Sequence, residues 1–269
     1  MANIIITPGT NSAFAPDKSF VIPRTDLEGF LLQQITTVVG SLEGDAVHAR
    51  IGVVDDDPTS AIVKEGDPID EGAVTFTEHV VQTSKFANLL VISNEQRRQP
   101  DGLGEIGNAQ VRSVAAIANR QFLQAGTAPK GILSGVAPTA LGDNTDALVD
   151  ALAVIEGAYG NNVQVVAHPT AVAALRKFKT AAGSNMPALD LAADTLLGLP
   201  LIKSPAMPAG QVLVIAKNAV YSAISPLTVA LSEEYAFNRD GVATRATCRG
   251  GWVIADPARL ALLSVESTL

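Results

Sequence analysis

The spacing of apolar residues changes several times along this chain, and each change marks a different predicted element. In residues 1–24, isolated apolar side chains are separated by three prolines, which predicts an extended arm because proline interrupts helices. Thr25 and Glu28 then form a capping-box pattern ahead of apolar residues at helical spacing, which predicts a short helix within residues 25–43. The arm can bury little apolar surface by itself, so we expect it to lie on another surface.

Residues rich in Val, Ile, Thr and Phe follow and predict two strands. The strands span residues 46–54 and 73–92, and the segment between them is polar and contains Pro and Gly. Loops longer than about 15 residues are uncommon in compact domains and are usually functional or disordered. The pattern therefore predicts a long two-stranded protrusion. An isolated hairpin is only marginally stable in water, so we expect a second surface to stabilise it.

Acidic side chains concentrate in the same region. The chain has 19 basic and 27 acidic residues and a formal charge of −8. Residues 43–79 alone hold ten acids and two bases, so the rest of the chain is neutral. Packed segments rarely hold so many carboxylates, which favours a segment that projects into solvent or faces a basic partner. An ordinary acidic surface loop is the alternative. The ten acids are Glu43, Asp45, Asp55, Asp56, Asp57, Glu65, Asp67, Asp70, Glu71 and Glu78.

Two further helices are predicted before the middle of the chain. Ser93 and Gln96 form a second capping-box pattern and start a short helix that Pro100 ends. From residue 103 to residue 125, apolar residues recur every three or four positions, as on one face of a long helix. At about 1.5 Å per residue this helix would be roughly 35 Å long. Gly126 follows it as the predicted C-cap.

The second half of the chain has the pattern of an α/β unit. It predicts a helix over residues 145–159 that Gly160 ends, a buried strand over residues 163–167, and a helix that begins near Pro169 and ends at Gly183. Short β-like runs dominate afterwards. They are residues 199–203, 212–216, 220–224, 228–231, 242–248, 252–254 and 260–265.

Composition excludes several classes of protein. The chain has 269 residues, of which 47% are hydrophobic and 17% charged, as expected for one large globular domain or two smaller ones. The acidic balance argues against a protein that grips nucleic-acid phosphates across its whole face. The single cysteine, Cys248, cannot form an intramolecular disulfide, and no Cys/His spacing suggests zinc. The start of the chain lacks signal-peptide features, and no apolar run approaches the ~20 residues of a membrane span.

Motifs for catalysis are weak. Residues 126–131 have part of the spacing of a phosphate-binding loop, but Lys130 precedes the second glycine and no Ser or Thr follows it. The three histidines lie far apart in the sequence, and none is paired with a nucleophile. His168 stands at a strand-to-helix junction, where α/β enzymes place functional groups, but we favour an ordinary helix cap.

Two other candidates also favour structural interpretations. Asp55, Asp56 and Asp57 are consecutive and precede a proline. This run lacks the wider ligand spacing of a calcium loop and favours a solvated turn. Cys248 lies in a β-like run and is expected to be a structural thiol. We therefore expect no catalytic residue, no metal and no cofactor.

The order of these elements, together with four short segments, resembles the major capsid proteins of tailed bacteriophages with the Hong Kong 97-type fold. The segments are LVISNE at residues 90–95, GTAPKGIL at 126–133, AHP at 167–169 and LGLPLIKSPAMP at 197–208. Each is weak singly, whereas their order and spacing together are fairly specific. The resemblance covers nearly the whole chain and implies an α+β fold.

The resemblance also implies a division of the chain. An N-arm would span residues 1–24, a short helix 25–43 and an E-loop hairpin 44–80. A peripheral domain would span residues 81–142, with a spine helix over 103–125 and its return strands at 236–269. An α/β axial domain would span residues 143–235.

The implied function is that of a coat protein and not of an enzyme. Subunits would assemble as hexamers and pentamers into an icosahedral head that encloses double-stranded DNA, without sequence-specific binding and without a membrane. The resemblance implies portal and scaffolding proteins as partners, allows a decoration protein, and places assembly in the cytoplasm of a bacterial host. Many relatives carry an N-terminal scaffolding segment, whereas the arm here begins at Met1, so we expect scaffolding to be a separate protein or dispensable.

Residues of the arm and the E-loop are the candidates for contacts between subunits. Some relatives join subunits through an isopeptide bond from an E-loop lysine. Lys64 is the one lysine of this E-loop, and its acidic surroundings favour an ion pair with a neighbour over a cross-link. The candidate contact residues are Phe14, Phe20, Arg50, Lys64, Glu65, Asp67, Asp70 and Glu71.

Two alternatives stay open. An encapsulin-like shell would share this fold and package an enzyme cargo, although encapsulins resemble chains that begin with an amphipathic helix, and residues 1–24 do not have that pattern. A soluble α/β enzyme would place its site near residues 163–170.

Overall fold

The computed structural model describes residues 29–42, 48–56, 62–64, 71, 74–98, 102–142, 144–179 and 194–265. Its helices are α1 (Leu31–Gln34), α2 (Asn94–Arg97), α3 (Gly102–Gln124), α4 (Asp146–Gly157) and α5 (Pro169–Arg176), with 3₁₀ turns η1 (Lys217–Ala219), η2 (Phe237–Arg239) and η3 (Pro257–Arg259). Its strands are β1 (Thr37–Gly40), β2 (His48–Asp56), β3 (Thr75–Ser93), β4 (Thr139–Ala140), β5 (Val163–Ala167), β6 (Thr195–Leu196), β7 (Leu199–Lys203), β8 (Gln211–Ala216), β9 (Val220–Ile224), β10 (Thr228–Ala236), β11 (Gly241–Ile254) and β12 (Leu260–Ser264).

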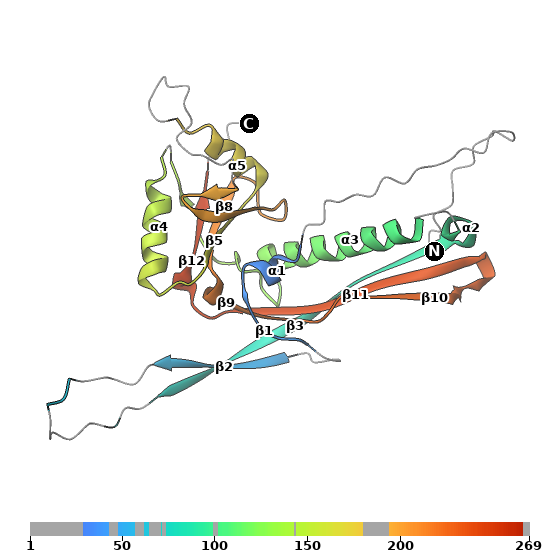
Figure 1. Cartoon of the computed structure of the whole chain (residues 1–269), viewed down its shortest axis with the longest axis horizontal. Helices are drawn as coiled ribbons and strands as arrows, with labels where there is room; N and C mark the ends of the chain where they lie inside the picture. The colour runs from blue at the N-terminus through green and yellow to red at the C-terminus, as the bar shows by residue number, and fades with distance from the viewer. Residues whose placement is uncertain are drawn as a thin grey trace.

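The described strands form two six-stranded sheets. One has the order β1-β9-β11-β3-β2, with β10 paired to β11, and the other has the order β4-β12-β8-β5-β7-β6. Figure 1 shows an upright α/β part at one end and the long strands β3 and β11 running away from it beneath α3. The hairpin of β2 and β3 projects from the opposite side of the sheet. The predicted α+β class is confirmed.

Strand β3 belongs to two pairings along its 19 residues. Its second half, Thr83 to Ser93, pairs antiparallel with β11, while its first half, Thr75 to Gln82, pairs antiparallel with β2. The predicted strands over residues 46–54 and 73–92 are therefore confirmed to within two residues. The same strand anchors the protruding hairpin in the sheet of β1, β9, β11, β3, β2 and β10, which we call the central sheet.

Helix α3 lies along β3 and β11 and forms the largest core with them. Phe122 is fully buried and meets Trp252 edge to face, with ring centroids 5.3 Å apart. The Nε1 of Trp252 donates a hydrogen bond to the carbonyl oxygen of Lys130 at 2.7 Å. Asn119 holds α1 in place, because its Oδ1 accepts from the Leu31 amide at 2.9 Å. The predicted helix over residues 103–125 is confirmed within one residue at each end.

The expectation that Gly126 caps α3 is wrong. The chain turns back after the helix, and the amides of Gly131, Ile132 and Leu133 donate to the carbonyl oxygens of Ala125, Phe122 and Leu123. These bonds satisfy carbonyls that a left-handed glycine would otherwise satisfy locally. Gly131 is required for this return, because a Cβ there would lie 2.5 Å from the Ala125 amide nitrogen.

The second sheet carries α4 and α5 in one hydrophobic core. Leu148 and Ile155 of α4 and Val172 and Leu175 of α5 belong to the same cluster as Val165 of β5. The neighbouring residues of these strands face the opposite way and join the core beneath α3, as the burial of Val166, Leu213 and Ile215 there shows. This alternation follows from the two-residue period of a strand and joins the two parts of the fold.

Two predicted helix ends in this unit differ in the structure. Helix α4 ends at Gly157, and the left-handed residue after it is Tyr159 (φ 57°) and not Gly160. Gly160 is needed for a close approach instead, since a Cβ there would lie 2.7 Å from the carbonyl oxygen of Ile155. Helix α5 ends at Arg176, before the predicted end at Gly183, which lies outside the described residues.

The first predicted helix is also shorter than expected. Within residues 25–43, α1 covers four residues, and residues 37–40 form β1, which pairs parallel with β9. The β-branched run from Ile35 to Val39 favours a strand over a helix, which accounts for the difference. Thr25 and Glu28 lie outside the described residues.

The sheets do not divide at the predicted boundaries. Strands β9 and β10, which the boundaries place in the unit of residues 143–235, pair with β11 in the central sheet. Strand β12, expected among the return strands 236–269, pairs with β8 in the α/β sheet. The runs 242–248 and 252–254 form the single strand β11. Within it, position 251 requires glycine, because a Cβ there would lie 2.5 Å from the Gln82 carbonyl oxygen.

Candidate functional site: subunit contact surfaces

The β2–β3 hairpin presents one face to solvent. Cross-strand partners Val54 and Phe76 lie on this face, with 47% and 75% of their surface exposed, and Val80 on the same face is 49% exposed. The other face is more covered, since Ile51 and Val81 are buried. An exposed apolar stripe on a two-stranded ribbon is unfavourable in water, which indicates that another surface covers it.

An ion pair lies within this exposed face. Arg50 donates to Glu78, with an Nη1 to Oε2 distance of 3.2 Å, and both side chains are solvent-exposed. Exposed pairs of this kind contribute about 0–1 kcal/mol, so the pair adds little to the stability of the hairpin. The pair places two opposite charges on the same face as Val54, Phe76 and Val80.

The structure describes three of the eight predicted contact residues. Arg50 is paired with Glu78, as described above, while Lys64 and Glu71 are exposed. Ile62, two residues before Lys64, is fully exposed. The remaining candidates lie outside the described residues; they are Phe14, Phe20, Glu65, Asp67 and Asp70.

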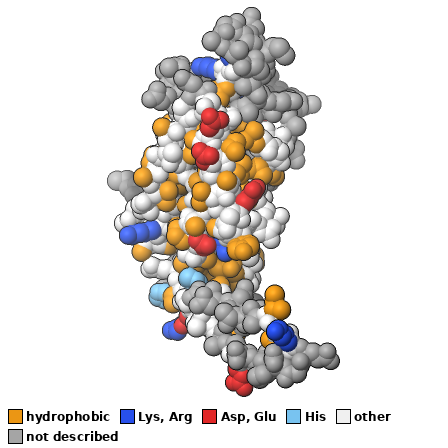
Figure 2. Space-filling view, turned by 90° about the vertical axis from the view of Figure 1, so that its left-hand side faces the viewer, with side chains coloured by type: hydrophobic (Ala, Val, Ile, Leu, Met, Phe, Trp, Pro, Cys, Tyr) orange, Lys and Arg blue, Asp and Glu red, His pale blue; other side chains and the backbone are white. Residues whose placement is uncertain are grey.

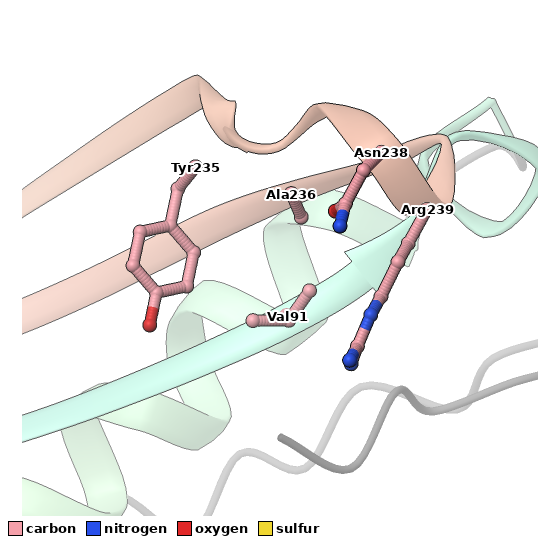
Figure 3. Close-up of a pocket in the computed structure, with 5 residues that line it drawn as sticks. All are labelled: Val91, Tyr235, Ala236, Asn238 and Arg239. Atoms are coloured by element: carbon pink, nitrogen blue, oxygen red, sulfur yellow. The ribbon is translucent and has the colours of Figure 1, made fainter. Parts of the chain in front are cut away.

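A second surface lies at the far end of the central sheet. Leu89 of β3, Leu231 and Tyr235 of β10 and Arg245 of β11 line a shallow groove of about 370 Å³, which we call the β10 groove. It adjoins a second hollow of about 220 Å³ through the shared residue Tyr235. Figure 3 shows that second hollow, with Tyr235 and Arg239 on either side of Val91. The floor of the β10 groove is largely apolar, and Arg245 supplies positive charge beside it. The second hollow has a more polar lining that includes Asn238 and Arg239.

The family of the chain follows from a match over most of its sequence. A model of the phage capsid family matches residues 24–265. The chain belongs to the phage capsid family. A comparison with curated protein sequences finds no significant match.

Several solved structures share the fold. The capsid of an empty GTA particle is 21% identical and covers 97% of this chain and 95% of its own, with a TM-score of 0.72. A structure from Gordonia phage Cozz is 16% identical, covers 98% of this chain and 99% of its own, and has a TM-score of 0.70. A structure from Microbacterium phage Oxtober96 is 14% identical, covers 97% of this chain and 96% of its own, and has a TM-score of 0.69. The Hong Kong 97-like architecture expected from the sequence agrees with these neighbours.

Membership of the phage capsid family gives the protein its role. It is a phage coat protein, a structural protein that assembles with copies of itself into a capsid and is located in the virion. The two surfaces described above are therefore candidates for contacts between copies of this coat protein.

Two candidates for other chemistry, His168 and Cys248, have structural roles in the coat protein, and the predicted cap at Ser93 forms as well. His168 caps α5, because its side chain accepts a hydrogen bond from the Thr170 amide at 3.1 Å, as predicted. Ser93 caps α2 by accepting from the Gln96 amide at 3.2 Å. Cys248 is a buried free thiol of the main core. Asp55 and Asp56 close strand β2, whereas the predicted turn that includes Asp57 lies outside the described residues.

Metal-ligand clusters and membrane-spanning helices are both absent from the described residues. Across the part of the chain that the structure describes, no group of three His, Cys, Asp or Glu side chains could hold a metal ion. None of the described helices has both the length and the hydropathy to cross a membrane.

The thiol of Cys248 should be slow to react in the folded coat protein. Burial raises the pKa of the Cys248 thiol, and its hydrogen bond to Ser225 opposes the shift only in part. Because the thiolate is the nucleophile, we expect alkylation by iodoacetamide at pH 8 to be at least about 50-fold slower than in the chain unfolded by guanidinium. Because the folded-state pKa is raised, the stability that the neutral thiol contributes is fully present below the unfolded pKa of roughly 8.5. This contribution is lost as pH rises through the folded pKa. Equal labelling rates in the two states would contradict the assignment.

Sequence reasoning missed the β10 groove. Leu231, Tyr235 and Phe237 are 42%, 62% and 84% exposed, although the run over residues 228–231 has the composition of a buried strand. In the described part of the chain, β10 pairs with β11 alone, so it is an edge strand. The signal that could have revealed this is the run Ser232-Glu233-Glu234, because consecutive polar residues face both sides of a strand and exclude burial of either.

Proposed function

We propose that this coat protein forms hexamers and pentamers that close into an icosahedral head around double-stranded DNA. The head would assemble in the cytoplasm of a bacterial host, with portal and scaffolding proteins as partners and with room for a decoration protein. Within this proposal, residues 1–24 act as an N-arm and residues 44–80 as an E-loop. The central sheet with α3 forms the peripheral domain, and the sheet beneath α4 and α5 forms the axial domain.

The observation that carries this proposal is the exposed face of the β2–β3 hairpin. Val54, Phe76 and Val80 are exposed on a ribbon that extends beyond the central sheet. A second copy of the chain can cover this face, and each copy then offers its own hairpin to the next. Contacts of this head-to-tail kind form closed rings when the rotation between subunits closes.

The β10 groove is the surface that fits the hairpin best. The groove combines Leu89, Leu231 and Tyr235 with Arg245, whereas residues 43–79 combine apolar side chains with a charge of −8. Apolar contact would supply affinity, and opposite charge would supply orientation. We therefore assign contacts between subunits to the predicted residues of the arm and hairpin. They are Phe14, Phe20, Arg50, Lys64, Glu65, Asp67, Asp70 and Glu71.

The charge of the chain suits a container for DNA. A protein that neutralises many phosphates holds DNA by counterion release and loosens it only at high salt. The net charge of −8 supports enclosure of DNA without strong or sequence-specific binding, so that the genome can leave.

Electron microscopy of the purified full-length protein tests this proposal. We expect rings and closed shells of megadalton mass in negative stain, and shells from the native source should contain double-stranded DNA that resists added nuclease until the shells are disrupted. Shells that contain a protein cargo and no DNA would instead indicate an encapsulin-like compartment. A homogeneous monomer or small oligomer that never forms rings would contradict the proposal.

A further inference from the structure

Helix α4 has an outer face that is neither purely polar nor covered. Leu148 and Ile155 point into the core, while Val149 and Val154 are 51% and 62% exposed on the other side. Tyr159, just beyond the helix, is 86% exposed. Solvent-facing helix positions normally hold polar side chains, so apolar residues there indicate a contact surface. Figure 2, viewed from the side on which α4 lies in Figure 1, shows apolar side chains gathered with carboxylates on this side of the molecule.

The charged side chains of α4 itself have one sign. Asp146, Asp150 and Glu156 are exposed on α4, and residues 143–157 contain four acids and no base. The helix packs against η3, β8 and β12, so its acids belong to the β12 side of the α/β sheet. Arg259 of η3 donates to the Ala158 carbonyl oxygen at 2.7 Å and pairs with Asp256.

The opposite edge of the same sheet is basic. Strands β6 and β7 form this edge, and exposed Arg176 and Lys177 lie at the end of α5 beside it. Lys203 of β7 pairs with Asp194, which also interacts electrostatically with Arg176, so these side chains form one cluster. The described residues 169–179 and 194–203 contain four bases and one acid. Leu197 in the β6–β7 turn is 45% exposed and gives this edge an apolar contact of its own.

We propose that the outer face of α4 in one subunit docks on the α5–β7 edge of the next subunit in a ring. Val149, Val154 and Tyr159 would pack near Leu197, while Asp150 and Glu156 would face Arg176 and Lys177. This contact is separate from the hairpin contact and involves only the α/β part of the fold. The inference rests on the proposed ring assembly and names the surfaces that close its centre.

A second copy of the chain is the occupant that the observations favour. The two surfaces carry opposite charge, each has an apolar contribution, and they lie at opposite sides of one sheet. A contact between two different patches is heterologous. In a closed ring every copy of both patches is covered, whereas an open chain leaves one patch uncovered at each end. The short edge strands β4 and β6, of two residues each, argue against extension of the sheet between subunits and favour side-chain contacts.

Charge reversal on each side tests the inference. The α4 variant carries Asp150→Lys and Glu156→Lys, and the edge variant carries Arg176→Glu and Lys177→Glu. All four side chains are exposed, so the substitutions should leave the fold intact. Circular dichroism with thermal unfolding checks that each variant is folded. We expect each variant alone to give at least ten-fold fewer shells than wild type, measured by sedimentation and negative-stain microscopy. The swap variant, which carries all four substitutions, is the matched control and should restore shells because opposite charges meet again.

A mixture of the two reversal variants gives a sharper readout. Each α4 variant can contact an edge variant on both sides, so the two must alternate around a ring. Six subunits can alternate, whereas five must leave one contact between like charges. We expect the equimolar mixture to form hexamers, and the assemblies should have fewer closed shells than the swap variant.

The outcomes separate this inference from the proposed function. If wild-type protein forms shells and both reversal variants do so with equal yield, or if the folded swap variant fails to assemble, the contact assigned to α4 is wrong while the coat assembly stands. If wild-type protein forms neither rings nor shells, the proposed ring assembly fails and this inference fails with it.

Discussion

Deletion of residues 55–72 is expected to abolish shells while the rest of the coat protein stays folded. The deletion removes seven acids and one base, and with them most of the charge of the acidic segment. It leaves Val54 and Phe76 opposite each other in the ladder of β2 and β3, with three residues to connect them. Three-residue loops are common in hairpins, so the shortened ribbon can still close. The core beneath α3 has no described side chain in the deleted segment and should be unchanged.

The measurements are negative-stain microscopy for shells and urea unfolding for stability. We expect no closed shells and an unfolding midpoint close to that of wild type. A matched variant replaces residues 57–70 with the same number of Gly and Ser residues, which keeps the reach of the hairpin and removes its side chains. If the tip acts through its side chains, this variant should fail to form shells as well. Normal capsids from the deletion would overturn the assignment of the hairpin as an assembly element.

Substitution of Phe122 by Ala is expected to destabilise the subunit by about 3–5 kcal/mol, because it removes a fully buried ring and leaves a cavity. The edge-to-face contact with Trp252 adds to this loss. Phe122 lies in the same core as Val166 and Leu213 of the α/β sheet, so the cavity opens where the two parts of the fold meet. Domains of this kind are stable by only about 5–15 kcal/mol in total.

Urea denaturation of the unassembled subunit measures this effect, and a change in midpoint without a change in slope shows a loss of stability alone. Ile117→Ala is the control on the same helix, because Ile117 is 43% exposed and should cost less than about 1.5 kcal/mol. A loss of under 1 kcal/mol for Phe122→Ala would show that the core relaxes around the missing ring, contrary to the close packing described here.

Local features of this protein could be predicted from its sequence because neighbouring residues supply all the interactions involved. The caps at Ser93 and His168 each depend on a backbone amide two or three residues away. The length of α3 follows from the repeat of apolar residues, and its bounds agree within one residue. The acidic hairpin was identified from two β-rich runs and the polar segment between them. The family was suggested by the order of such elements and not by any single motif.

Contacts between distant segments were decided by the tertiary structure. The end of α3 was predicted at a glycine cap, whereas residues 131–133 return to bond its last carbonyls. The pattern of short strands does not say which strands pair, so the sequence could not show that β9 and β10 join β11 or that β12 joins β8. The sequence also does not determine which apolar side chains are exposed. The exposed residues of β10 and of the outer face of α4 are of the same types as buried residues.

The sequence by itself determined the kinds of element, their order, the acidic segment and the likeness to a coat protein. Tertiary structure decided how the elements pair and which apolar side chains have no cover within the subunit. The physical reason is that secondary structure depends on interactions over a few residues, whereas burial depends on what the rest of the chain places nearby. In this coat protein, exposed apolar residues of the hairpin, such as Phe76, and of α4, such as Val154, are ones that we assign to contacts with neighbouring subunits.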